Sequence, residues 1–157
     1  MASGWRSARL ETTYQEARSV LDGQRSVIAD IDAKAMYTVR VDVVIAGVVV
    51  AAIRIAGPGM FREQFLAGGL TLLLLSMALG VLTYTESGLF LGPNRSHIRQ
   101  LVYDDSENGT WEQDLCIRMG DWIDENQSDL LKNGRLLLSA QLALLAGVTL
   151  IVGGVAL

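Results

Sequence analysis

The chain has few of the residues from which catalytic and metal sites are built. Its 157 residues include one histidine, His97, and one cysteine, Cys116. A single cysteine excludes an intrachain disulfide and a cysteine zinc cluster, and a single histidine has no companion for metal binding. No nucleophile, base and orienting group can be assembled from these two residues and the loop acids. We therefore expect neither an enzyme, nor a cofactor, nor a bound metal.

Charge is also absent from two long stretches, 65–85 and 136–157, and a shorter apolar stretch, 43–53, is flanked by Arg40, Asp42 and Arg54. A helix needs about 20 apolar residues to cross a hydrocarbon layer of about 30 Å. The pattern predicts an all-α integral membrane bundle, a single domain over 1–157. Its three transmembrane helices are expected at 37–57, 65–85 and 136–157.

The polar segments between these stretches show helical periodicity. Apolar residues recur about once per turn through the first segment, 1–36, which predicts a cytoplasmic amphipathic helix that continues into the first span. Gly57-Pro58-Gly59 then predicts a short hairpin between the first two spans. The segment 86–135 is interpreted as a helical loop. Its second amphipathic helix begins near Thr110 and carries an apolar stripe of Trp111, Leu115, Met119, Trp122 and Ile123.

Basic residues are distributed unequally around the expected spans. Only Arg54 and Arg62 of the 13 basic residues lie near the hairpin between the first two spans, and the rest lie before or near the start of the first span or in 86–135. The positive-inside rule places the amino terminus and 86–135 in the cytoplasm of a multi-pass cell-membrane protein, with the carboxyl terminus outside. Glycosylation triplets at Asn94, Asn108 and Asn126 would matter only in the opposite orientation.

The charged residues are mainly acidic. Aspartate and glutamate number 17 against 13 lysines and arginines, the sequence pI is about 4.9, and lysine is rare. This composition suggests a cytoplasm of high salt, as in a halophilic archaeon. No nucleic-acid partner is expected.

Two charged residues lie in or beside the first expected span. Arg40 and Asp42 are two residues apart, so on a helix they point about 200° from each other and cannot pair. Arg40 can extend to the interface, whereas the short Asp42 lies about 8 Å inside, at 1.5 Å per residue. A depth argument predicts a polar cluster of Asp42, Gln141, Ser139 and Thr83. This cluster either fixes the register of the helices or lines a path for ions or water at an oligomer axis.

Small residues four apart occur in each expected span and would permit close helix contacts. The pairs are Gly47 and Ala51, Ser76 and Gly80, and Ala143 and Gly147.

A short motif at the start of the first span carries a family resemblance. The run Asp32-Ala33-Lys34-Ala35 resembles the Asp-x-Lys-Ala sequence that opens the first span of small transmembrane effectors in Pycsar antiphage systems. The tight hairpin of two spans, the cytoplasmic helical segment and Lys132 before the last span also fit that layout. The family tends to have a small polar amide where this chain has Asp42.

The resemblance implies a membrane-disrupting effector of antiviral defence, activated by a cyclic nucleotide or by a soluble signalling partner and working as a homo-oligomer in the bilayer. The implied phosphate contacts are Arg25, Lys34, Lys132 and Arg135, which would otherwise serve as ordinary positive-inside anchors. Two alternatives remain open. One is a small ion channel or transporter subunit, and the other is a membrane adaptor that holds a soluble partner through Trp111, Met119 and Trp122.

Overall fold

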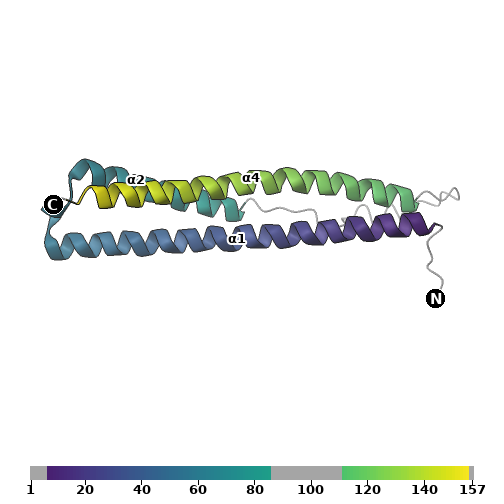
Figure 1. The fold of residues 1–157 in the computed structure, drawn as a ribbon, viewed down its shortest axis with the longest axis horizontal. Coiled ribbons are helices and arrows are strands. Elements are labelled where there is room, and N and C mark those ends of the chain that lie inside the picture. Colours follow the sequence, from purple (N-terminus) through teal and green to yellow (C-terminus); the bar gives the residue numbers. More distant parts are fainter. Residues whose placement is uncertain (1–6, 86–110, 156–157) are drawn as a thin grey trace. The chain divides into compact units, whose positions relative to one another are not determined.

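The structure is a computed structural model that describes residues 7–85 and 111–155. These residues form three α-helices, α1 (Ala8–Ala56), α2 (Glu63–Thr85) and α4 (Trp111–Gly153), and a 3₁₀ turn, η1 (Pro58–Met60) (Figure 1). Within these residues the β-structure is limited to one isolated bridge between Phe61 and Val155. The all-α prediction is confirmed for this part of the chain.

Within residues 7–85 and 111–155, two helices, α2 and α4, are long and apolar enough to cross a membrane, rather than the three that the sequence predicted. The segment 37–57 forms the second half of α1, where Arg40, Asp42 and Arg54 restrict the uninterrupted apolar stretch. The span expected at 65–85 corresponds to α2, and the one at 136–157 to the last part of α4.

The helix ends follow from local chemistry. Glu11 lies in the first turn of α1 and Arg54 in its last turn. A negative charge at the first turn and a positive charge at the last turn both interact favourably with the helix dipole. Gly57 ends α1 with a positive φ of 85° and donates its N–H to the Ile53 carbonyl at 3.0 Å. This left-handed conformation suits glycine because it has no Cβ. The break predicted at Gly57-Pro58-Gly59 is confirmed, and α2 begins at Glu63.

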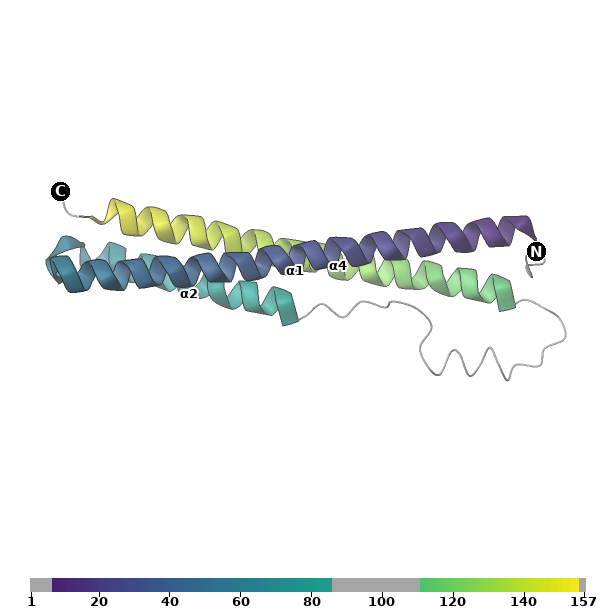
Figure 2. The ribbon, with the colours of Figure 1, turned by 90° about the horizontal axis from the view of Figure 1, so that it is seen from below.

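The described residues divide into two compact units, 7–28 with 111–130 and 29–85 with 131–155. Unit 1 and unit 2 below mean the described residues of each. Both α1 and α4 contribute residues to both units. In unit 2, α2 runs antiparallel to the second half of α1, as Figure 2 shows. Contacts agree with this direction, since Ser76 meets Asp42 and the later Gly80 lies against the earlier Ala35.

Burial repeats every seven residues along all three helices. Within a heptad, buried residues follow one another at intervals of three and four residues. This spacing lets helices pack as in left-handed coiled coils. We call these positions the heptad core. Its buried members are Leu21, Gln24, Ile28, Ala35, Thr38, Asp42 and Val49 on α1, Gly69, Leu73, Ser76, Gly80 and Thr83 on α2, and Glu112, Met119, Asn126, Leu130, Asn133, Leu137, Ala140, Gly147 and Ile151 on α4.

Glycines let α2 and α4 approach closely within unit 2. A Cβ added to Gly69 would lie 2.9 Å from the Gly147 carbonyl oxygen, and one added to Gly147 would lie 3.0 Å from that of Gly69. Of the small pairs predicted from sequence, Ser76 with Gly80 and Ala143 with Gly147 are buried. The third pair differs, because Gly47 and Ala51 are exposed and a Cβ on Gly47 would meet nothing within 4 Å.

Candidate functional site: a buried carboxyl group in a helical bundle

Unit 2 has the polarity expected of a protein surrounded by lipid. Its buried polar residues are Thr38, Asp42, Ser76, Thr83 and Asn133. Its exposed large apolar residues lie on all three helices and include Val43, Val44, Val48, Val50, Ile55, Leu74, Leu75, Val81, Leu82, Leu138, Leu142, Leu145 and Val152. In water such an arrangement would expose a large apolar patch, which marks a membrane or interaction surface.

The central polar contact of unit 2 joins α1 and α2. Asp42 and Ser76 are each 0% exposed, and the Ser76 hydroxyl donates a hydrogen bond to Asp42 Oδ2 at 2.8 Å. Asp42 Oδ1 is also buried and has no hydrogen-bond partner in the structure. The heptad spacing explains the meeting, because Asp42 lies one heptad after Ala35 and Ser76 one heptad after Gly69.

Two threonines lie on one side of this contact. Thr38 precedes Asp42 by one turn and donates its hydroxyl to the Lys34 carbonyl at 3.0 Å, while Thr83 donates to the Leu79 carbonyl at 2.9 Å. On the other side the buried residues are apolar and form a cluster of Val49, Phe61, Leu73 and Ile151. The carboxyl group thus lies where the interior of unit 2 changes from polar to apolar.

The predicted polar cluster is only partly assembled. Thr83 and Asp42 are both buried, but Ser139 and Gln141 are exposed on α4, and the described hydrogen bond of Asp42 goes to Ser76. The predicted contact between Asp42 and Gln141 is therefore wrong. Depth along a helix fixes the level of a residue but not its face, and Gln141 follows the buried Ala140 by one residue, about 100° around the helix.

Sequence reasoning did not identify Ser76 as the partner of Asp42. The signal was present in α2, where small and polar residues repeat at seven-residue intervals as Gly69, Ser76 and Thr83. Such a repeat predicts that Ser76 faces the neighbouring helices, whereas a depth argument alone treats all residues of one level equally.

The residues implied as phosphate contacts are exposed and distributed over both units. Arg25 belongs to unit 1, whereas Lys34, Lys132 and Arg135 belong to unit 2. Lys34 forms an ion pair with Asp30, N to O at 2.5 Å, between two exposed side chains four residues apart. Exposed pairs of this kind contribute little to stability, about 0–1 kcal/mol.

The motif that carries the family resemblance has a packing role at one position. Ala35 is fully buried, and its carbonyl oxygen lies 3.4 Å from where a Cβ on Gly80 would be. A side chain at Gly80 would push α1 and α2 apart, because its Cβ would lie 2.7 Å from Val39 Cγ2. Asp32 is half-buried and Lys34 is exposed.

Unit 1 contains a second buried polar contact. Asn126 donates from Nδ2 to Gln24 Oε1 at 3.2 Å, and Gln24 Nε2 donates to the Ile123 carbonyl at 2.9 Å. Polar residues in a heptad core fix the register of the paired helices. Asn126 is 1% exposed, so its triplet is closed to glycosylation in this fold. Asn94, Asn108 and His97 lie outside the described residues.

Cys116 and the aromatic stripe of α4 also lie in unit 1. The Cys116 thiol is half-buried with Sγ 3.9 Å from the Leu10 carbonyl, and burial, then the charge of Glu112, raises its pKa. Met119 is buried and Trp122 half-buried, whereas Trp111 is 49% exposed. Of the three residues named for an adaptor, only Trp111 presents a large exposed surface.

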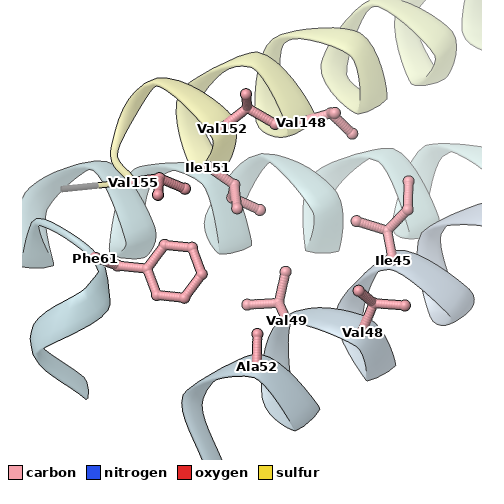
Figure 3. Close-up of a pocket in the computed structure, with 9 residues that line it drawn as sticks. All are labelled: Ile45, Val48, Val49, Ala52, Phe61, Val148, Ile151, Val152 and Val155. Atoms are coloured by element: carbon pink, nitrogen blue, oxygen red, sulfur yellow. The ribbon is translucent and has the colours of Figure 1, made fainter. Parts of the chain in front are cut away.

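An apolar cavity of about 260 Å³ lies in unit 2 between α1 and the end of α4. Figure 3 shows its lining, with the Phe61 ring at one end. The side chains are Ile45, Val48, Val49, Ala52, Phe61, Val148, Ile151, Val152 and Val155. This lining offers no polar group to orient a ligand. Over residues 7–85 and 111–155, no group of three or more histidine, cysteine or acidic side chains could hold a metal ion.

No protein-family model matches this chain, and neither the curated proteins nor the solved structures contain a match to it.

Proposed function

We propose that the protein is a membrane-embedded effector that dissipates ion gradients as a homo-oligomer when a signal reaches its helices outside the bilayer. The observation that carries the membrane part is the reversed polarity of unit 2. Its polar side chains are buried and its large apolar side chains are exposed. Contact of these exposed apolar side chains with lipid is favourable, whereas their contact with water is not.

The second half of α1 acts as a third span in this proposal. Asp42 is shielded by Ser76, and the exposed Arg40 can extend its long side chain to the interface. These two arrangements account for the charges that interrupt the apolar stretch of α1. Val44, Val48 and Ile55, which are 65%, 63% and 88% exposed, then face lipid. The distribution of basic residues supports a cytoplasmic amino terminus and an outer carboxyl terminus.

Oligomerisation follows from the closed interior of one chain. Val49, Leu73, Ile151 and Phe61 fill one end of unit 2, so a single bundle provides no continuous polar path. A path for ions therefore requires several copies around an axis. The Gly47 and Ala51 pair, exposed on α1, suits close helix contacts between copies.

The signal in this proposal is a cyclic nucleotide or a soluble partner, as the resemblance to antiviral effectors implies. Its phosphate contacts would be Arg25, Lys34, Lys132 and Arg135. The ligand would favour the open arrangement only by binding it better than the closed one. A small ion channel that needs no ligand shares the same membrane bundle.

Flux measurements with the purified protein in liposomes test this function. We expect loss of an imposed potassium diffusion potential on titration with cyclic nucleotides, and weaker ligand dependence when Lys132 and Arg135 are changed to glutamine. The exposed Arg18 changed to glutamine serves as the control. Flux without ligand would favour the ion channel. Sealed liposomes with every nucleotide, from a preparation shown to be oligomeric, would contradict the effector and favour an adaptor, for which the exposed Trp111 offers a contact.

A further inference from the structure

We propose that Asp42 is a proton-binding site reached from the Thr38 and Thr83 end of unit 2, and that protons are the ions whose gradient the protein dissipates. This inference rests on the proposed function and names the ion that it moves. The site consists of the Asp42 carboxyl group and the Ser76 hydroxyl, both fully buried.

The hydrogen-bond pattern leaves one position for a proton. Ser76 Oγ donates to Asp42 Oδ2, whereas Asp42 Oδ1 is buried without a partner. A buried ionised oxygen with no donor is strongly unfavourable, because neither water nor a dipole replaces its hydration. A proton on Oδ1, taken from water, makes the carboxyl group neutral and leaves the Ser76 hydrogen bond intact.

The neighbouring elements supply no opposite charge. In α2 the residues from Gln64 to Thr83 include no titratable group, and Tyr84 is exposed beyond them. In α4 the stretch 136–155 has no titratable residue, and Lys132 and Arg135 precede it. On α1 itself Arg40 is exposed and points about 200° away from Asp42. Because no cation among residues 7–85 and 111–155 pairs with it, the carboxyl group can be neutralised by a proton.

The buried polar side chains of unit 2 indicate from which side protons reach Asp42. Thr38 lies one turn before Asp42, and Thr83 follows Gly80, which packs against Ala35 and Val39. Both threonines therefore lie on the same side of the Asp42 and Ser76 contact and are buried. The opposite side is closed by Val49, Leu73, Ile151 and Phe61, so a proton held at Asp42 can pass on only when the open arrangement of the oligomer separates these side chains. Protons reach Asp42 from the threonine side, which is the cytoplasmic side in the proposed orientation.

Infrared spectroscopy of the purified protein in liposomes tests the site without depending on flux. We expect a protonated-carboxyl C=O band at neutral pH that disappears in Asp42→Asn and remains in Asp22→Asn, a change at an exposed acid. Transfer to D₂O should shift this band as the site exchanges. Thr83→Val should slow the shift severalfold, whereas Thr71→Val should leave it unchanged, because Thr71 is exposed and makes the same bond to its own helix, at 2.9 Å to the Ala67 carbonyl.

Proton and dye fluxes then separate this inference from the proposed function. If the parent protein acidifies entrapped pyranine and Asp42→Asn does not, the result supports both the proton site and the proposed function. Proton or calcein flux that Asp42→Asn leaves unchanged overturns the proton site as the route and leaves the effector function standing. The absence of all flux contradicts the function, and in that case the carboxyl band still decides the site. Absence of an Asp42-dependent band overturns the proton site whatever the flux.

Discussion

At the scale of single residues, Asp42 shows what a sequence can predict about an acidic residue beside an apolar stretch and what it cannot. The sequence places this acid directly before the apolar stretch 43–53, and an acid in that position needs to be shielded from lipid. Its partner does not follow from depth alone, since Ser76 and Gln141 both qualify as polar side chains. The structure selects Ser76 because this residue lies on the buried face of α2, whereas Gln141 is exposed.

Removal of the Ser76 hydroxyl should destabilise unit 2. Ser76→Ala takes away the described hydrogen bond of the buried Asp42 carboxyl group, which costs about 1–3 kcal/mol for a polar group left unsatisfied. The expected result is a lower thermal unfolding midpoint in detergent at neutral pH. Thr71→Ala, at an exposed position of the same helix, should change the midpoint little. Equal midpoints for Ser76→Ala and the parent would contradict the contact.

At the scale of helices, the position of each helix in the sequence was easier to predict than which of its sides is buried. The uncharged stretch 65–85 agrees with α2, Glu63–Thr85, because length and hydropathy are properties of the sequence itself. Which side of a helix is buried depends on its neighbours. The predicted pair Gly47 and Ala51 is thus exposed, while Gly69, which was not singled out, lies at the closest approach of α2 and α4.

Glycine substitutions in the two environments should therefore differ in sign. In Gly69→Ala the new Cβ would lie 2.4 Å from Ile151 Cγ1 and 2.9 Å from the Gly147 oxygen, so the helices must separate. Overpacking of this kind costs about 1–3 kcal/mol. Gly47→Ala meets nothing within 4 Å and should be neutral or stabilise the helix by up to about 1 kcal/mol.

Thermal unfolding of both glycine variants in the same detergent measures the difference. A Gly69→Ala protein as stable as the parent would mean that α2 and α4 do not approach closely. If Gly47→Ala instead weakens self-association while the fold is retained, the exposed pair on α1 is a contact between copies, as the proposed oligomer requires.

At the scale of the whole chain, the sequence indicates a membrane protein more clearly than it indicates a function. A charge-free stretch of about 20 residues is what a spanning helix requires, and α2 and α4 are long and apolar enough to be such helices. The response to a signal depends instead on side chains brought together by folding. Arg25 and Lys132, which the resemblance groups as ligand contacts, belong to different units.

Cysteine labelling should determine the orientation of the chain. In a protein with Cys116 changed to serine, Gly59→Cys in the hairpin between α1 and α2 should react with a membrane-impermeant maleimide in intact cells. Asp22→Cys should react only after the cells are broken, and both positions are exposed in the fold. Reaction at position 22 in intact cells would reverse the orientation proposed from the basic residues.

Asn133 weakens the packing of the helices of unit 2 at its own level along α4. It occupies a heptad-core position of α4 in unit 2 with 1% of its surface exposed, and neither its Nδ2 nor its Oδ1 has a hydrogen-bond partner in the structure. An unsatisfied buried polar group costs about 1–3 kcal/mol. The helices of unit 2 are therefore held together less firmly here than at the well-packed layers around Gly147. We therefore expect the helices of unit 2 to separate more easily at Asn133 than at the close glycine contact of Gly69 and Gly147.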